Sequence, residues 1–354
     1  MQKTVLFLCV FPLLLTLGLF SAGCAIKKPL TPQERAPKLS DDPAFLADLR
    51  QTRPQGPGGI AVVAPSSGPA DNGASAHALA DKLGVRFPQS AVDNRQVPYN
   101  ATSDQARLRL LADALTDPAV EVIWALRGGY GSSRLLSGLS RLALPRSTKK
   151  ILIGYSDITF LHLFFQKKGW KTVHASLFGE LDSQSKDEDN FRRLAALLAG
   201  RVKELRYAEI HPYNQAALAL TRPVRAVLTG GNLTCIAAAE GTPWPLQASG
   251  KILFLEDVKE PGYKIDRMLT QLRLAGSLKG VKAVVLGAFT TGDEFTEHAL
   301  KRFASDCGIP VFKTEQFGHG PQNFPLIFNA LATLQQNPDD KGAFILRIRA
   351  DQLP

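Results

Sequence analysis

Three residues that can perform nucleophilic chemistry stand at the ends of predicted strands. The first is Ser156, in the sequence Gly154-Tyr-Ser-Asp157, which follows a predicted strand at 150–154 and precedes a predicted helix. A strand–turn–helix pattern of this kind exposes a hydroxyl at the carboxyl edge of a parallel sheet. The new helix also directs free N–H groups at a developing oxyanion. The simpler interpretation is a serine that caps the helix, and Ile158 stands where a Gly-x-Ser-x-Gly elbow has its second glycine.

A carboxylate and an imidazole hold comparable positions in the second half. Glu256 ends the apolar run at 252–255, where an acidic group is costly unless it is used or paired. The alternative role is an ion pair with Lys259 or Arg267. His319 lies between two glycines, where we do not expect a packing role. Because triads of serine, histidine and acid occur in any chain order, the three residues are candidates for one site.

A glycine-rich turn precedes Ser156 in the chain. The sequence Gly128-Gly-Tyr-Gly131 ends an apolar run at 120–126 and allows close backbone approach. It can supply an N–H group beside Ser156, or it can be only a tight turn. It lacks the lysine of a phosphate loop and the full GxGxxG spacing. No two His or Cys show metal-ligand spacing, so we expect no metal and no cofactor.

The elements that must position these residues alternate between apolar strands and amphipathic helices. Strands that are apolar on both faces predict a parallel sheet covered by helices. Residues 60–180 are therefore predicted as a doubly wound α/β domain. Residues 181–222 are predicted as a connector with a helix at 187–198, and 223–354 as a second α/β domain. Within the second domain, the mixed run at 344–349 is typical of a sheet-edge strand.

Composition limits the classes of function. The 354 residues carry 42 basic and 32 acidic side chains, a formal charge of +10. The length fits two domains, and 45% hydrophobic and 21% charged residues exclude a disordered chain or a coiled coil. The basic residues are scattered, so we expect no nucleic-acid partner. The basic excess either has no role or favours an anionic envelope polymer or membrane surface.

The N-terminus has the composition of an export signal. Lys3 is followed by an apolar run at 5–20, which is short for a membrane span, and then by small residues and Cys24. We predict a signal peptide at 1–23, with Cys24 as a lipidated first residue by resemblance to bacterial lipoproteins. Ordinary cleavage nearby is the alternative. The Pro-rich stretch at 24–59 is predicted as a tether with a short helix around 43–50.

Seven short motifs, in order, resemble those of the LD-carboxypeptidases, the muramoyltetrapeptide carboxypeptidases that are related to the microcin-immunity peptidases. The resemblance covers about Ile60 to Arg349. The motifs are Gly128-Gly-Tyr-Gly-Ser-Ser-Arg-Leu-Leu136, Ile153-Gly-Tyr-Ser-Asp157, Gly230-Gly-Asn-Leu233, Gly241-Thr-Pro-Trp244, Leu255-Glu-Asp257, Arg267-Met-Leu-Thr-Gln-Leu272 and Phe317-Gly-His319.

The resemblance implies a serine peptidase with Ser156 as nucleophile, His319 as general base and Glu256 as orienting acid. It implies oxyanion-hole N–H groups from Gly129 and Asp157. The implied fold is an N-terminal flavodoxin-like domain and a C-terminal domain of the swivelling type, commonly in a homodimer. The implied reaction removes the terminal D-Ala from murein tetrapeptides. The product carboxylate needs a cationic or N–H partner, for which Arg134 is one candidate.

The export signal distinguishes this chain from the many relatives that lack one. It predicts a periplasmic protein anchored to the outer membrane, which meets murein peptides on intact wall or cuts L,D cross-links. Two other functions also fit an exported chain with two α/β domains. The first is a periplasmic solute-binding lipoprotein without turnover, and the second is a non-catalytic wall-anchoring module.

Overall fold

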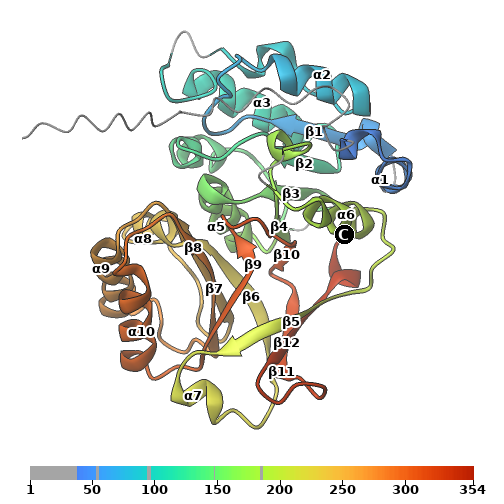
Figure 1. Cartoon of the computed structure of the whole chain (residues 1–354). Coiled ribbons are helices and arrows are strands. Elements are labelled where there is room, and N and C mark those ends of the chain that lie inside the picture. The colour runs from blue at the N-terminus through green and yellow to red at the C-terminus, as the bar shows by residue number, and fades with distance from the viewer. Residues whose placement is uncertain (1–37, 53–55, 94–96, 147, 184–185) are drawn as a thin grey trace, which may run out of the picture. The chain divides into compact units, whose positions relative to one another are not determined.

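The computed structural model describes residues 38–354 except 53–55, 94–96, 147 and 184–185. The predicted signal peptide, Cys24 and the first part of the predicted tether lie outside the described residues. Figure 1 shows two sheets, the first built mainly from the N-terminal half and the second from the C-terminal half. Within the described residues, no helix combines the length and the apolar character that crossing a membrane requires.

The first sheet contains the apolar runs that the sequence predicted as buried strands. Its first four strands are parallel and follow chain order, and every one of their residues is buried. The fifth strand is antiparallel to β4 and comes from the C-terminal part of the chain. The order is β1 (Ile60–Val63), β2 (Val122–Ala125), β3 (Ile151–Gly154), β4 (Thr172–His174) and β10 (Leu326–Phe328).

Helices connect the parallel strands, as the alternating pattern predicted. Ser103 caps α3 by accepting a hydrogen bond from the Ala106 N–H. The helix after β2 is short, because a 3₁₀ turn at 132–135 precedes it. The helices are α2 (Ala74–Leu83), α3 (Asp104–Thr116), α4 (Leu136–Leu139), α5 (Thr159–Lys167) and α6 (Glu188–Leu198).

The second sheet is a closed barrel of seven strands. Its order is β11 (Leu331–Gln336), β12 (Phe344–Arg349), β5 (Glu204–Pro212), β9 (Val311–Gly318), β8 (Ala283–Thr290), β7 (Ile252–Val258) and β6 (Val224–Asn232). The segment β6–β9 is parallel, and the other pairings are antiparallel. Figure 1 shows the helices α8 (Leu233–Ala239), α9 (Gly262–Leu274) and α10 (Thr296–Asp306) outside the barrel, with the short α7 (Gln215–Leu218) near its lower end. The predicted α/β fold class, with a parallel sheet followed by a second sheet domain, is confirmed.

Two expectations about the second half differ from the structure. The predicted connector at 181–222 contains β5, a barrel strand whose buried residues Leu205, Tyr207 and Ile210 are separated by exposed charged ones. The run at 344–349 is not an edge, because β12 pairs with β11 on one side and β5 on the other. Closing the barrel removes the unpaired edge that its basic residues had indicated.

The last part of the predicted tether is folded onto the first domain. Asp42 caps α1 (Pro43–Arg50) by accepting hydrogen bonds from the Ala44 and Phe45 N–H groups. The helix buries Phe45 and Leu49 in the core. It also forms an ion pair between Asp48 and Arg201, 2.5 Å apart. The segment that follows residue 37 is therefore part of the folded unit.

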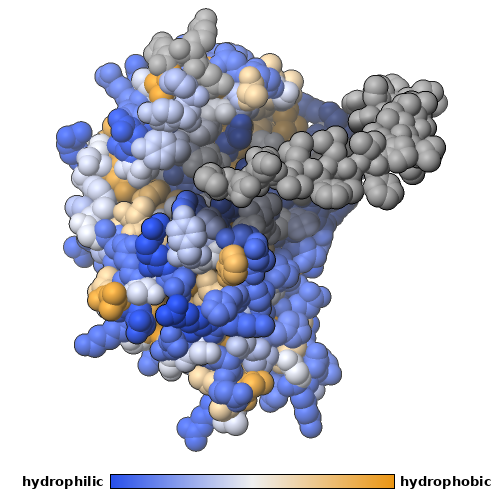
Figure 2. Space-filling model, turned by 60° about the vertical axis from the view of Figure 1, so that its left-hand side comes forward, coloured by the Kyte–Doolittle hydropathy of each residue, from blue (hydrophilic) through white to orange (hydrophobic). Residues whose placement is uncertain are grey.

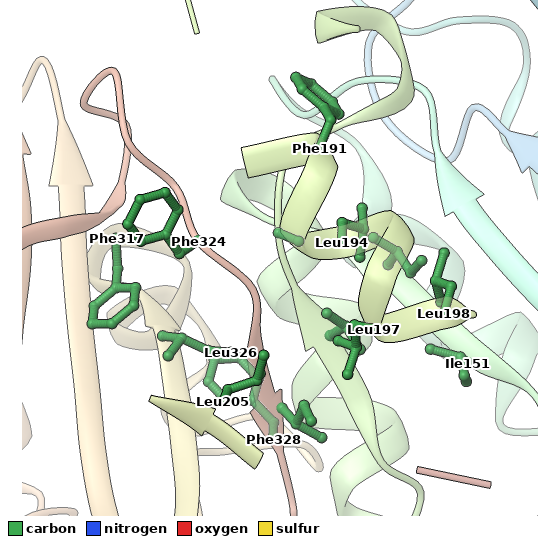
Figure 3. Close-up of a cluster of buried hydrophobic side chains, with 14 of the residues drawn as sticks. Ile151, Phe191, Leu194, Leu197, Leu198, Leu205, Phe317, Phe324, Leu326 and Phe328 are labelled. Carbon is green, nitrogen blue, oxygen red and sulfur yellow. The ribbon is translucent and has the colours of Figure 1, made fainter. Parts of the chain in front are cut away.

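One hydrophobic core runs from the first sheet into the barrel. Figure 3 shows Leu194 and Leu197 of α6 near Leu326 and Phe328 of β10, with Phe317 of the barrel on the other side. These side chains fix the two sheets to each other by burial of apolar surface. On the outside, the face in Figure 2 is mainly hydrophilic, with hydrophobic residues scattered over it.

Candidate active site

Ser156 lies at a sharp turn between β3 and α5, as the sequence predicted. Its φ is +62°, a left-handed value that costs a non-glycine residue energy and that concentrates at functional sites. A Cβ on Gly154 would lie 2.9 Å from Ile158 Cγ1, so the first glycine of the motif leaves room for the isoleucine. This packing explains how an elbow forms here without a second glycine.

The glycine turn at 128–131 lies directly beside Ser156. A Cβ on Gly128 would lie 2.8 Å from Ser156 Oγ and 3.5 Å from the Asp157 nitrogen. Gly129 has a φ of +98°, and its backbone N–H donates no hydrogen bond within the described part of the chain. The Asp157 N–H belongs to the first helical turn, where N–H groups lack intrahelical acceptors. Two backbone donors therefore flank the serine.

The carboxylate of Asp157 joins the loops around the serine. Its Oδ2 accepts hydrogen bonds from Ser66 Oγ at 2.6 Å and from the Ser132 N–H at 2.8 Å. Ser132 Oγ donates in return to the Asp157 carbonyl at 2.5 Å. Burial raises the pKa of Asp157, while these hydrogen bonds act in the opposite direction. The side chain therefore positions the backbone on both sides of Ser156.

His319 and Glu256 form a close pair. Nδ1 of His319 lies 2.5 Å from Oε2 of Glu256, whose side chain is fully buried, whereas that of His319 is 13% exposed. A Cβ on Gly318 would lie 2.9 Å from Glu256 Oε2, so this glycine permits the approach. Burial lowers the pKa of His319, but the negative charge of Glu256 outweighs it and the pKa lies above the ordinary value of 6.5.

Glu256 stands at an irregularity of the barrel. The pairing of β7 with β8 shifts register between Leu255 and Asp257, which places Glu256 at a bulge. Bulges redirect side chains next to active sites. The neighbouring Asp257 accepts hydrogen bonds from Asn232 and Thr234 instead, and so points to a different set of partners.

Tyr155 and Lys186 lie near His319, and neither was predicted from the sequence as a site residue. The Tyr155 ring lies 4.7 Å from the His319 ring, measured between centroids, and its hydroxyl donates to Glu180 at 2.6 Å. Nζ of the buried Lys186 donates to the Gly320 carbonyl at 2.8 Å. Tyr155 could have been found from its place beside Ser156, whereas no sequence pattern marked Lys186.

The barrel meets the first domain at the turn after Ser156. The Asn232 N–H donates to Thr159 Oγ1 at 3.0 Å, and a Cβ on Gly231 would lie 2.6 Å from the same oxygen. The Cys235 thiol contacts the Ser156 carbonyl oxygen at 3.8 Å. The Gly230-Gly-Asn232 motif thus explains how a barrel loop packs closely against the serine turn.

The predicted residues meet at one cavity of about 1040 Å³. Gly129, Ser156 and His319 line it, and Glu256 and Asp157 are buried beside them. Arg134, the candidate partner for the product carboxylate, does not line this cavity and instead pairs with Asp104 at 2.6 Å. His174, at the end of β4, does not line the cavity and is completely buried.

Comparisons with known proteins agree with this fold. Residues 60–175 match the family model of the LD-carboxypeptidase N-terminal domain, and residues 225–334 match that of the C-terminal domain. A Rickettsia conorii protein named "Putative carboxypeptidase" is 40% identical over 283 residues, 80% of this chain and 89% of that protein. The murein tetrapeptide carboxypeptidase of Pseudomonas aeruginosa is 31% identical over 79% of this chain and 94% of its own length.

A solved structure shows similarity to the same family. The crystal structure of muramoyltetrapeptide carboxypeptidase from Oxalobacter formigenes matches with a TM-score of 0.68 and 28% identity, over 82% of this chain and 98% of that one. The fold and the matched domains define the class of the protein as a carboxypeptidase, a hydrolase of peptide bonds. Within that class, the chain belongs to the LD-carboxypeptidase family.

Proposed function

We propose that the protein is a serine LD-carboxypeptidase that removes the terminal D-Ala from murein tetrapeptides. The observation that carries the proposal is the 2.5 Å contact of His319 with Glu256, at the cavity that Ser156 lines. The name of the Pseudomonas relative supports the substrate class. The left-handed turn at Ser156 supports the role of nucleophile, because strain of this kind is typical of such elbows.

The proposed mechanism divides hydrolysis into acylation and deacylation. Nε2 of His319 takes the proton of the Ser156 hydroxyl while its oxygen attacks the carbonyl carbon before D-Ala. The same imidazole then gives this proton to the departing amine, and an acyl-enzyme remains. Water attacks the ester by the same route and releases the shortened peptide. Glu256 holds the imidazole by Nδ1 and stabilises its protonated form.

The negative oxygen of the tetrahedral intermediate is held by backbone donors in this proposal. The Gly129 and Asp157 N–H groups are the candidates, and such a donor typically contributes roughly 3–4 kcal/mol to the transition state. Asp157 would thus act twice, by its N–H toward the oxyanion and by its carboxylate toward Ser66 and Ser132.

The decisive experiment is mass spectrometry of murein tetrapeptide incubated with the purified protein. Loss of one D-Ala is expected, and Ser156→Ala should lower turnover roughly 10³-fold or more while the fold is retained. Ser140→Ala, an exposed serine, is the matched control and should be fully active. Full activity in Ser156→Ala would exclude the serine mechanism. Binding of the peptide without turnover, and without labelling of Ser156 by a serine-reactive probe, would favour a solute-binding protein.

Export and anchoring are proposals from the sequence alone. We expect the signal at 1–23 to direct the chain to the periplasm and Cys24 to carry the lipid that anchors it to the outer membrane. Labelling with a radioactive fatty acid tests this, since Cys24→Ala should remove the label. The proposed substrates there are peptide stems on intact wall and L,D cross-links. A homodimer is likewise proposed, and sedimentation equilibrium would test it.

A further inference from the structure

The cavity at Ser156 contains charged groups of two kinds, which differ in how they are paired. Its carboxylates are hydrogen-bonded within the protein. Asp71 accepts from the Gly73 and Ser75 N–H groups. Glu180 and Asp182 likewise accept, from Tyr155 and Leu177 and from the N–H and hydroxyl of Ser40.

The cations of the cavity are less completely paired. Lys82 forms an ion pair with Asp41 at 2.6 Å, but Lys38, Arg127 and Lys259 have no acidic partner within the described residues. Arg127 is exposed, and its only hydrogen bond there runs from Nη1 to the Gly68 carbonyl, at 3.0 Å. Because a guanidinium has five N–H donors, most of them stay available to a ligand. The cavity therefore offers three cations without an ion pair in the described residues, whereas its carboxylates accept hydrogen bonds from the protein.

Arg127 adjoins the glycine turn beside the reacting centre. It directly precedes Gly128, on which a Cβ would lie 2.8 Å from Ser156 Oγ. Lys38 precedes Ser40, whose hydroxyl accepts a hydrogen bond from Lys82 Nζ. Lys259 follows Glu256 by three residues.

The position of Arg127 matches the geometry of a carboxypeptidase substrate. In a peptide that loses its last residue, the terminal carboxylate lies one residue beyond the scissile carbonyl, and consecutive Cα atoms are about 3.8 Å apart. Its partner must therefore stand within one side chain's length of the nucleophile. Gly179 lies beside the arginine, since a Cβ there would be in ordinary van der Waals contact with Arg127 Cγ at 3.7 Å.

We propose that Arg127 binds the terminal carboxylate of the substrate and thereby selects leaving groups that carry an α-carboxylate. This inference rests on the proposed carboxypeptidase function. An arginine can hold a carboxylate through two parallel N–H···O bonds, which fix orientation as well as charge. The contact would orient the departing amino acid so that its amine faces His319.

The test pairs a change in the enzyme with a change in the substrate. The wild type, Arg127→Leu and the control Arg134→Leu are each given a tetrapeptide ending in D-Ala and the same peptide ending in D-Ala amide. In the wild type, the free acid should have a kcat/KM about 10- to 100-fold above that of the amide, because a hydrogen bond to a charged group is lost with the amide. Arg127→Leu should lower this ratio to about one. Only the kcat/KM of the free acid should fall, chiefly because its KM rises. Arg134→Leu should retain the wild-type ratio.

Each outcome separates this proposal from the one on which it rests. An acid-to-amide ratio that is unchanged in Arg127→Leu would overturn the assignment. A ratio that falls to about one in Lys259→Met but not in Arg127→Leu would overturn it as well. Equal use of acid and amide by the wild type would also overturn it. If the wild type releases D-Ala from neither peptide, the proposed function itself is wrong. Arg127→Lys keeps the positive charge but not the paired N–H donors of the guanidinium. Its acid-to-amide ratio should therefore lie between those of Arg127→Leu and the wild type.

Discussion

His319 Nδ1 lies 2.5 Å from Glu256 Oε2, although 63 positions separate the two residues and a third strand, β8, runs between theirs in the barrel. Gly287 in β8 helps to make this contact possible. A Cβ at Gly287 would lie 2.7 Å from the Phe317 carbonyl oxygen and 2.7 Å from the Phe254 ring. Because that strand has no side chain at this point, residues of β7 and of the loop after β9 can meet across it.

Gly128→Ala should abolish most activity without unfolding the protein. The new Cβ would stand 2.7 Å from Ser156 Cβ and 2.8 Å from its Oγ, closer than real carbon contacts allow. The serine turn must therefore shift, and we expect turnover to fall roughly 10²-fold or more, since a displacement of about 1 Å has such an effect. Steady-state kinetics with circular dichroism measures both properties. Gly58→Ala, with no atom within 4 Å of the added carbon, should behave as the wild type.

The acidic limb of the pH–rate profile should report the pairing of His319. As a general base, His319 must be neutral, so kcat/KM falls as the pH drops through its pKa, which lies above 6.5 in the wild type. Glu256→Gln removes the charge that raises this pKa, while burial of the ring and the nearby Lys186 still lower it. The midpoint of the limb should therefore move to lower pH, together with a fall in the maximal rate of up to about 10⁴-fold.

A charge change elsewhere on the barrel provides the control for that profile. Glu315→Gln alters a side chain of β9 that is 70% exposed, and it should leave the acidic midpoint where it is. If Glu256→Gln leaves the midpoint unchanged or moves it to higher pH, the titrating group is not His319 in contact with Glu256.

Asp257 should make the stability of the protein fall between about pH 4 and pH 6. Burial, and then the charge of Glu256, raise the pKa of Asp257 from 3.8 to about 6 in the folded state. Between these values the folded protein binds more protons than the unfolded chain, so the free energy of unfolding decreases as the pH rises. A shift of this size corresponds to roughly 3 kcal/mol.

Urea unfolding of the wild type and of Asp257→Asn at several pH values measures this effect. The variant cannot titrate at this position, so its decrease in stability from pH 4 to pH 6 should be smaller than that of the wild type by roughly 2–3 kcal/mol. Parallel curves for the two proteins would show that the carboxyl group is ionised throughout this range.

Arg107→Met should destabilise the first domain. The Arg107 side chain is completely buried and donates to the carbonyls of Pro65, Thr102 and Gly131. Its loss would leave the Pro65 and Thr102 carbonyls without this donor, whereas the Gly131 carbonyl would keep the Arg134 N–H. The free energy of unfolding should fall by roughly 3–5 kcal/mol. Chemical denaturation tests this, with Arg109→Met as the matched control. The Arg109 side chain is 83% exposed on the same helix, so its loss should change stability by less than about 1 kcal/mol. Equal effects of the two variants would contradict the role given to Arg107.

The sequence predicted the elements that carry the candidate site better than those that close the barrel. Buried parallel strands are continuous apolar runs, so the positions of Ser156 and Glu256 at strand ends followed directly. The strand β5 was missed because it alternates charged and apolar residues within a polar stretch. The three-residue strand β10 is too short for any periodicity to register. Arg127 could not be chosen over Arg134 from the sequence, since only the fold shows which of them faces the cavity.

The strand β10 lies in the first sheet although the segments on both sides of it belong to the barrel. After His319 the polypeptide therefore passes from the barrel into the first sheet, forms β10 there, and returns to the barrel as β11. A truncated chain that ends before residue 326 would leave the edge of β4 bare, and bare edges recruit other strands. Separate expression of the two halves should therefore yield aggregates from the N-terminal piece.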